Sequence, residues 1–525
     1  MASLKFDLLD TVEQATTFGP RLGVLSLQRE DGSSLQIKTP GLITTTSRGV
    51  VPHLSRDHTS LTEAVRWVQL PFESFLERNP PIPTLQGGPH ALHKFLGYKT
   101  HQHLLSLTVR DPSDGREMPA NGKDHIAAMT IRGVRKITPT QWKEYMRACR
   151  PDVVAALSDV PFTQPPYSQK RITKSLERST AWLADLLSSQ SDLNHEPFNV
   201  LVHLVGSHDA RARQAFSEGL VEPLYGKDAE LIAPFKTLDE GVAGYILELE
   251  HLRASLVGAD SPDIHDAVSQ LCKASLAPLS FGKLRVIHTT SSPHDILQLV
   301  QDVGVDLFDA PWAHQAADLG IALDFRFPVS PPPLVVGQAC SSPMRRDGGK
   351  LDIGHNLFDT AYAHDHSRFA STFIDAATAS QLPDAHEARD FVCKCLACSP
   401  VTSEECLVHS SVDSFRNTNG ESMNLPYTRA YVHHLLHTHE MSSHALLATH
   451  NLSVVDRLLA DIRKMLSEPG GEARYREEAK KFYEAYDRQL SVFDEARAQW
   501  AKVERERGKG RLRREKDSDG ANDAD

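Results

Sequence analysis

The stretch "KLRVIHTTSSPHDILQLVQDVGVDLFDA", residues 283–310, contains two strand-like runs separated by one segment of helical length. The helix has a marked start, because Ser292 can cap it, Pro293 takes its first position and Asp295 completes a start like a capping box. Ile296, Val300 and Val303 then recur on one helical face. A strand, a helix and a second strand in this order predict a β–α–β unit with parallel strands.

Similar runs recur along the chain, with helical segments between them. Several are almost wholly apolar, as expected of parallel strands that are covered on both faces. The repetition predicts a (β/α)8 TIM barrel, an α/β fold. A doubly wound open sheet is the alternative, but no run is followed by a Gly-rich phosphate loop. The other runs are "LLSLTVRD" (104–111), "DVVAALSD" (152–159), "NVLVHLVGS" (199–207), "GVAGYILELE" (241–250) and "GIALDFRF" (320–327).

The composition limits the class of protein. A hydrophobic content of 40% and a charged content of 24% over 525 residues are ordinary for globular domains. The net charge of −11 argues against a protein that coats nucleic acid by bulk attraction. Seven cysteines, an odd number, do not suggest a disulfide framework, so we expect a reducing compartment. The sequence has no apolar stretch of membrane-spanning length, so we expect no integral membrane segment.

Three of those cysteines lie within six positions in "DFVCKCLACSP" (390–400). Cys393, Cys395 and Cys398 could converge on one soft cation, but structural zinc takes four cysteine or histidine ligands. A chance cluster of buried thiols is the alternative, although free cysteines have no reason to gather at ligand spacing. The candidates for the fourth ligand are Cys406, His409, His433, His434, His437, His439, His444 and His450.

Spacing alone leaves the fourth ligand open. Cys406 and His409 lie in a segment of loop composition and could close a local site. His450 shares an apolar helical stripe with Leu447 and Val454, where a satisfied core histidine is the ordinary interpretation.

The cysteine motif, followed by "YTRAYVHHLL" (427–436) and "HNL" (450–452), resembles the zinc subdomain of the tRNA-guanine transglycosylase family. The resemblance implies one structural zinc ion per chain, held by Cys393, Cys395, Cys398 and His450. The family places the Thr-Arg-Ala-Tyr helix a few residues after the third cysteine. Residues 399–424 intervene here, so we interpret them as a surface insertion.

Further matching stretches occur in the family's order, and they point to its non-catalytic branch. The resemblance implies a cytoplasmic accessory subunit, with peripheral association at the mitochondrial outer membrane as a further option. Its partners would be a catalytic subunit, in a heterodimer, and tRNA. That complex exchanges guanine 34 for queuine in tRNAs with GUN anticodons (Asp, Asn, His, Tyr). The stretches include "PGLITTTSRGVVPHL" (40–54), "RPDVVAALSD" (150–159) and "GVDLFDAPWAHQAADLGIALDF" (304–325).

The catalytic motifs of the family are only partly present. Its nucleophile motif G-[IV]-D-x-F-D matches "GVDLFDA" and places Asp309 at the nucleophile position, at a strand end where barrel enzymes carry catalytic groups. The Asp-Ser-Gly-Gly-[FY]-Gln motif, the Gly-rich loop after residues 241–250 and the Pro-Thr-Arg segment after the nucleophile are missing. We therefore expect Asp309 to be non-catalytic. A transglycosylase active through Asp309 is the first alternative, and a zinc-dependent hydrolase with an open metal position is the second.

A basic stripe lies in "QKRITKSLER" (169–178). Lys170, Arg171, Lys174 and Arg178 recur at helical spacing, so one helix face is cationic. A solvated helix face is the ordinary interpretation, and contact with tRNA phosphates is the more specific functional interpretation.

These patterns divide the chain into four expected regions. Runs at 20–27, 33–40 and 41–47, separated by Asp-Gly and Pro-Gly, predict a small antiparallel sheet that caps the barrel. Pro- and Gly-rich stretches at 79–89 and 330–350 are expected to be loops or insertions. The regions are the antiparallel sheet (1–50), the barrel with insertions (51–385), the zinc-binding and helical subdomain (386–500) and a disordered charged tail (505–525).

Overall fold

The computed structural model describes residues 3–9, 17–160, 165–188, 198–256, 264–329, 341–346, 348–375, 378–379, 391–400 and 425–505. The chain forms two compact units, Met1–Trp312 with Val455–Ala479, and Ala313–Val454 with Lys480–Asp525. Most of the predicted insertion 399–424, most of the loop 330–350 and residues 506–525 of the tail lie outside the described residues.

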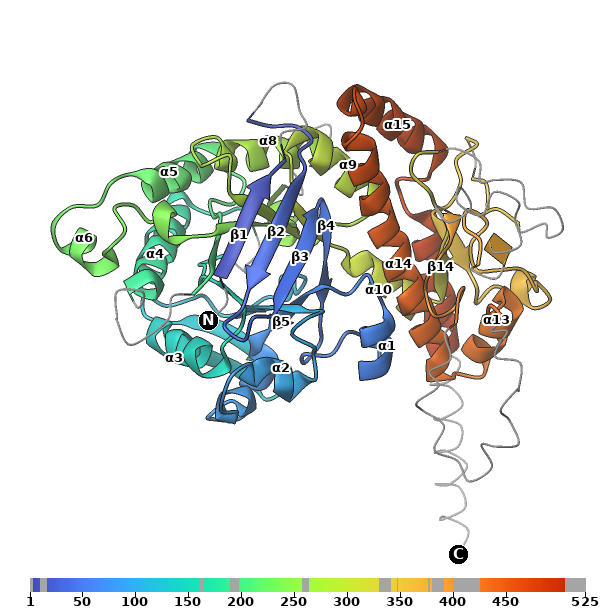
Figure 1. Cartoon of the computed structure of the whole chain (residues 1–525), viewed down its shortest axis with the longest axis horizontal. Coiled ribbons are helices and arrows are strands. Elements are labelled where there is room, and N and C mark those ends of the chain that lie inside the picture. Colours follow the sequence, from blue (N-terminus) through green and yellow to red (C-terminus); the bar gives the residue numbers. More distant parts are fainter. Residues whose placement is uncertain are drawn as a thin grey trace, which may run out of the picture. The chain divides into compact units, whose positions relative to one another are not determined.

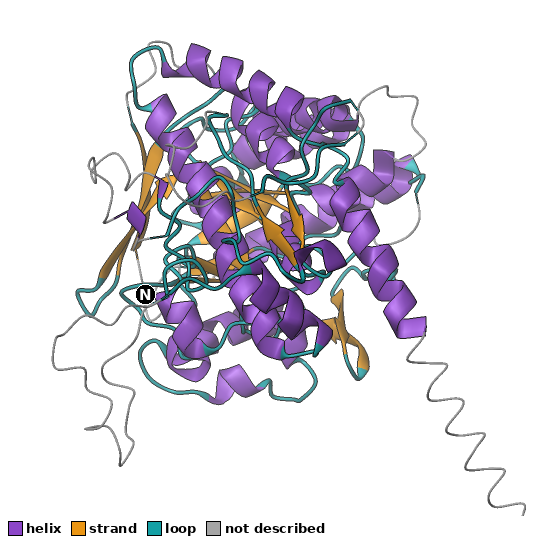
Figure 2. Cartoon of the chain, turned by 90° about the vertical axis from the view of Figure 1, so that its right-hand side faces the viewer, coloured by secondary structure: helices purple, strands orange, loops and turns teal. Residues whose placement is uncertain are grey.

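The first unit contains a closed barrel of eight strands, so the predicted TIM barrel is confirmed. Every neighbouring pair of strands is parallel, and β13 closes the ring against β4 through the pairs Leu307↔Gly41 and Asp309↔Ile43. The barrel strands lie inside a layer of helices (Figures 1 and 2). In ring order they are β4 (Gly41–Thr45), β5 (Trp67–Pro71), β6 (Leu104–Thr108), β9 (Val153–Ala155), β10 (Val200–His203), β11 (Gly244–Glu248), β12 (Leu284–His288) and β13 (Leu307–Asp309).

Two strand assignments made from the sequence are wrong, and one barrel strand was missed. The run at 41–47 is the first barrel strand and does not belong to the antiparallel sheet. The run at 320–327 lies outside the barrel, where β14 (Ile321–Leu323) pairs antiparallel with β15 (Gly354–Asn356). The missed strand is β5, which is buried throughout. A short apolar run has the same sequence pattern in the barrel and in an antiparallel sheet. The strand with which it pairs therefore decides to which sheet it belongs.

A three-stranded antiparallel sheet of β1 (Ser3–Leu8), β2 (Gly23–Gln28) and β3 (Ser34–Thr39) closes one end of the barrel (Figure 1). Burial alternates along β3, as expected of a sheet with one covered face. The inward side chains join a buried core with residues from the beginnings of the barrel strands, so the N-terminal end is filled and the C-terminal end is left for function. This core includes Leu25, Leu27, Leu35, Ile37, Leu104, Val153, Leu284 and Leu307.

Helix α9 (Pro293–Asp302) begins as the sequence predicts. The Ser292 Oγ accepts a hydrogen bond from the Asp295 backbone N–H at 3.3 Å, and Ile296, Val300 and Val303 are fully buried. The other helices are α1 (Arg56–Leu61), α2 (Ala91–Leu96), α3 (Pro139–Cys149), α4 (Gln169–Ser188), α5 (Ala210–Val221), α6 (Gly226–Ile232), α7 (Leu249–Leu256), α8 (Ile264–Leu276), α10 (Pro311–Asp318), α13 (Arg429–His437), α14 (Met441–Leu466) and α15 (Gly471–Ala485).

A buried ion pair ties the N-terminal segment to the barrel. Arg21 Nε donates to Asp306 Oδ1 at 2.9 Å, and its Nη1 donates to the Phe281 carbonyl at 2.6 Å. Asp306 Oδ2 also accepts the Arg285 backbone N–H at 2.7 Å. Asp306 is fully buried, so its charge depends on these donors.

Replacing Asp306 should therefore destabilise the first unit. We expect Asp306→Asn to cost about 3–5 kcal/mol, because it leaves the buried Arg21 guanidinium without its counter-charge. Asp7→Asn is the matched control, since Asp7 is 49% exposed and its pair with Lys5 is worth less than about 1 kcal/mol. Urea unfolding of the three proteins measures both effects, and equal midpoints for the two variants would contradict the assigned role of Asp306.

Candidate functional site

The three clustered cysteines and His450 meet in the second unit. Cys393, Cys395 and Cys398 lie in the segment 391–400, and His450 lies in α14. The His450 Nδ1 atom is 3.7, 3.6 and 3.5 Å from the three sulfur atoms in that order. A tetrahedral zinc ion, with Zn–S of about 2.3 Å and Zn–N of about 2.0 Å, places sulfur and nitrogen about 3.5 Å apart. The spacing of the donor atoms therefore fits a metal ion.

The imidazole of His450 is oriented for a ligand. Its Nε2 lies 2.8 Å from the Leu323 carbonyl, which can only accept, so Nε2 carries the proton and the Nδ1 lone pair faces the sulfurs. The side chain is fully buried, and the Phe369 ring packs edge-on at 5.4 Å. A histidine that only filled the core would have no reason to direct a free nitrogen at three thiols.

The backbone of the cysteine segment holds the sulfurs together. The Cys393 N–H donates to the Ile374 carbonyl at 2.9 Å, and the Cys398 N–H donates to the Cys395 sulfur at 3.2 Å. Hydrogen bonds from Cys395 and Cys398 lower the pKa of the Cys393 thiol well below its usual range. Burial raises the pKa of Cys395, and the neighbouring sulfurs raise that of Cys398, so the cluster favours a thiolate at Cys393, the form that binds a cation.

The other candidates for the fourth ligand do not join the cluster. His433 Nδ1 donates to the Leu357 carbonyl at 2.9 Å, His437 Nε2 to the Phe358 carbonyl at 3.0 Å, and His444 Nδ1 to the Ala317 carbonyl at 2.9 Å. The metal-type cluster found among the described residues also omits His434 and His439. Cys406 and His409 lie outside the described residues.

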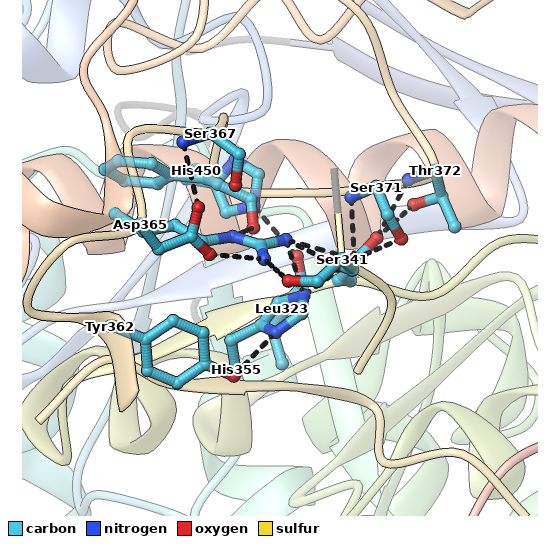
Figure 3. Close-up of polar contacts among 12 residues, drawn as sticks. Leu323, Ser341, His355, Tyr362, Asp365, Ser367, Ser371, Thr372 and His450 are labelled. Atoms are coloured by element: carbon cyan, nitrogen blue, oxygen red, sulfur yellow. Dashed lines mark hydrogen bonds and ion pairs between the residues drawn. The ribbon is translucent and has the colours of Figure 1, made fainter. Parts of the chain in front are cut away.

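A buried polar network, which the sequence did not predict, surrounds Arg429 at the start of α13. Figure 3 shows this network, with Ser341, His355 and Asp365 labelled. Arg429 Nη1 donates to Ser341 Oγ at 2.7 Å and to Asp365 Oδ2 at 3.1 Å. Arg429 Nη2 lies 2.8 Å from His355 Nε2. The guanidinium is fully buried, so these partners hold α13 in place.

Asp324 is the anionic centre of the same network. Its carboxylate accepts hydrogen bonds from the backbone N–H groups of Ser371 at 2.7 Å and Thr372 at 3.0 Å, and lies 2.8 Å from His355 Nε2. Burial raises the pKa of Asp324, but the hydrogen bond and charge of His355 outweigh it, so the pKa falls well below its usual range. Because Asp324 follows Leu323, the network also positions the carbonyl that orients His450.

In the first unit, Asp309 lies at the C-terminal end of β13 and is fully buried. Its Oδ1 accepts hydrogen bonds from the backbone N–H groups of Thr289 at 2.6 Å and Thr290 at 3.2 Å. Its Oδ2 lies 3.2 Å from His288 Nδ1. Both carboxylate oxygens therefore have partners at the end of the neighbouring strand β12.

Side chains fill the barrel mouth beside β10 and β11. Two cavities of about 30 and 20 Å³ are both lined by Val160, His203, Glu248 and His251. His203 Nδ1 lies 3.1 Å from Glu248 Oε1. Burial raises the pKa of Glu248, but the charge and hydrogen bond of His203 outweigh it and lower the pKa to about 2. Spaces of this size hold about one water molecule and cannot hold a purine.

The predicted cationic stripe on α4 has two parts. Arg171 donates to the buried Asp159 carboxylate at 2.8 and 2.9 Å, and Arg178 donates to it at 3.0 Å. Lys170 and Lys174 are exposed. Asp159 follows β9 at the barrel mouth and was missed from the sequence, although a carboxylate after an apolar strand is the signal that singled out Asp309.

No helix among the described residues combines the length and the apolar character that crossing a bilayer requires.

Comparison with known proteins assigns the chain to a family. The family model described as queuine tRNA-ribosyltransferase matches residues 16–488. The chain is 25% identical over 462 residues to the queuine tRNA-ribosyltransferase accessory subunit 2 of Drosophila persimilis, covering 87% of this chain and 89% of the relative. Proteins of the same name from Ixodes scapularis (25% identity, 86% and 95% covered) and Xenopus tropicalis (26% identity, 85% and 94% covered) are also similar. The chain therefore belongs to the queuine tRNA-ribosyltransferase family.

Proposed function

We propose that this chain is the non-catalytic subunit of a heterodimeric queuine tRNA-ribosyltransferase, which exchanges guanine 34 for queuine in tRNAs with GUN anticodons. The relatives named as accessory subunits support this role across most of their length. The observation that carries the proposal is the enclosure of Asp309, whose carboxylate oxygens already have partners at the end of β12. The cavities beside β10 and β11 are in addition too small for a purine.

Base exchange needs a carboxylate that reaches the ribose C1′ and a pocket that holds the departing and entering bases. Asp309 is at the family's nucleophile position, but its oxygens are directed at Thr289, Thr290 and His288. His203 and Glu248 lie paired beside the cavities. The partner subunit would therefore supply the chemistry, and this chain would supply structure and binding surface.

Two alternatives fit less well. The position of Asp309 favours a transglycosylase that is active by itself, but the partners of its two oxygens and the small cavities beside β10 and β11 oppose it. A zinc-dependent hydrolase needs a metal position open to water. The Cys3His cluster already offers four protein donors, and all four residues are buried.

Zinc is the cation that this donor set fits. Three sulfurs and one imidazole nitrogen at tetrahedral spacing would form a closed structural site around such an ion. Cys393, Cys395, Cys398 and His450 would hold one ion, which would link the cysteine segment to α14.

The same unit offers a surface for the partner. The rings of Tyr427 and Tyr431 stack at 5.6 Å and are 37% and 45% exposed, while Leu425 is 75% exposed. Exposed aromatic and apolar side chains in one place are typical of protein interfaces. The Tyr427 N–H donates to the Ala397 carbonyl at 2.9 Å, within the cysteine segment, so metal binding and this surface would be coupled.

We also propose that α4 contacts tRNA. Lys170 and Lys174 are the exposed cations of the stripe. Arg171 and Arg178 would contribute less to RNA binding, because they already pair with Asp159.

Removing a ligand should remove the metal. We expect one equivalent of zinc per chain in the parent, and close to none in Cys395→Ser and His450→Ala, with a large loss of soluble protein because the site supports the fold. Plasma mass spectrometry of the purified chains measures the zinc. Cys272→Ser is the matched control, since Cys272 is a buried free cysteine outside the cluster. Loss of zinc in Cys406→Ser while His450→Ala keeps it would show that the ligand set is wrong.

The exchange reaction should not need Asp309. The isolated chain is expected to incorporate no labelled queuine into tRNA, and Asp309→Asn assembled with an unaltered catalytic subunit should turn over within a few fold of the parent. The reason is that an enclosed carboxylate without a base pocket cannot attack a positioned substrate. Replacing the nucleophilic aspartate of the catalytic subunit by asparagine is the control and should abolish exchange. Loss of exchange in Asp309→Asn with the heterodimer intact on a sizing column, or incorporation by this chain alone, would overturn the proposal.

A further inference from the structure

A hairpin of β7 (Ile126–Thr130) and β8 (Gly133–Ile137) is inserted after the C-terminal end of the barrel strand β6. The two strands differ sharply in environment. Along β7 all residues but one are buried, whereas along β8 all residues but Ile137 are exposed. The hairpin therefore presents one strand at the end of the barrel where substrates of such folds bind.

The buried strand is fastened to the barrel. Arg110, just beyond β6, donates through Nε to the Ala127 carbonyl at 2.6 Å and through Nη2 to Asn121 Oδ1 at 2.7 Å. Glu73 Oε2 accepts the Met129 N–H at 3.1 Å. Arg110 and Glu73 are both buried, so the exposed strand is held at a defined position by the barrel.

The exposed part of the hairpin carries cations without paired acids. Arg132, Arg135 and Lys136 are exposed, and none of them forms an ion pair within 4 Å with a carboxylate of the described residues. Asp124 acts on Lys136 at longer range, but it is itself 2.9 Å from His125 Nδ1. Three positive charges thus lie within five positions of an otherwise acidic chain.

Three of the four acidic residues next to the hairpin are paired with cations or partly neutralised. A cavity of about 420 Å³ beside Thr130 and Ile131 is lined by four carboxylates and two arginines. Two of these acids are already paired, Glu77 with Arg48 at 3.4 Å and Asp114 with Arg116 at 2.5 Å. Glu73 accepts backbone N–H groups, and burial raises its pKa to about 7, which weakens its negative charge further.

Two apolar side chains accompany the cations. Ile131 is 72% exposed and Val134 is 37% exposed. A surface of cations with a few apolar contacts fits an RNA sugar-phosphate backbone, because phosphates take the guanidinium and ammonium groups while the sugars contact apolar atoms. A purely apolar protein interface would be depleted in charge at its centre.

We propose that the β7–β8 hairpin is a tRNA-binding element that contacts the phosphate backbone through Arg132, Arg135 and Lys136. The inference rests on the proposed function, since it assigns part of the tRNA surface of that complex to this chain. The cations of the hairpin differ from Arg171 and Arg178 of α4. The hairpin cations are exposed, whereas the two arginines form ion pairs with Asp159.

The test uses the full chain assembled with its catalytic subunit and a transcribed tRNA with a GUN anticodon. Arg132→Ala/Arg135→Ala/Lys136→Ala should raise the Kd at least about tenfold at 0.1 M salt and make the slope of log K against log salt shallower by about 2–3. The control Arg211→Ala/Lys227→Ala/Lys236→Ala removes the same charge from exposed positions on α5, α6 and the loop that follows, and should change the Kd less than about twofold. Arg132→Lys/Arg135→Lys keeps the charge and should retain most of the binding.

The possible outcomes test the RNA-binding role of the hairpin separately from the proposed function of the chain. An unchanged Kd and salt slope in the triple hairpin variant, with tight binding by the parent complex, would overturn the inference and leave the proposed function standing. Failure of the parent complex to bind tRNA would overturn both. Dissociation of the heterodimer by the hairpin variant, seen on a sizing column, would assign the hairpin to a protein contact and overturn the RNA role. Thermal unfolding of each variant shows whether it is folded.

Discussion

The pairing of β13 with β4 closes the barrel, and most of the first unit depends on it. The pair joins residues more than 260 positions apart and brings Asp309 beside Ile43. The close approach explains why position 41 is a glycine, because a Cβ there would lie 2.8 Å from the Lys38 carbonyl and 3.0 Å from the Leu307 side chain. With the other end filled by the antiparallel sheet, all strand-end side chains gather at one mouth.

At that mouth, three carboxylates at or near strand ends are paired within the chain. Asp309 is held by backbone N–H groups, Asp159 by Arg171 and Arg178, and Glu248 by His203. A catalytic carboxylate needs a free oxygen and room for a substrate, and unpaired buried groups of that kind reduce stability. Pairing each carboxylate within the chain removes that cost.

The second unit is organised around two linked centres. The Leu323 carbonyl orients His450 toward the cysteines, and the next residue, Asp324, anchors the network that includes His355 and Arg429. Arg429 begins α13, whose exposed face carries Tyr431. A metal ion would therefore act on more than the cysteine segment, because its histidine ligand, β14 and α13 share hydrogen bonds. Loss of such an ion would therefore be expected to disturb β14 and α13 as well as the cysteine segment.

The sequence by itself determined the repeating β–α pattern, the start of α9 at Ser292 and the ligand spacing of the three cysteines, because each depends on residues close together in the chain. Spacing alone could not choose His450 as the fourth ligand; family resemblance made that choice, and the structure then brought its Nδ1 to the sulfurs. Only the tertiary structure decided that residues 41–45 pair with β13 and that residues 321–323 lie outside the barrel. It also decided the partners of the charged side chains: Arg171 and Arg178 pair with Asp159, and His203 pairs with Glu248. Local patterns define which side chains are apolar or charged, but a ladder partner or a counter-ion comes from a distant segment, and its identity depends on how the whole chain packs.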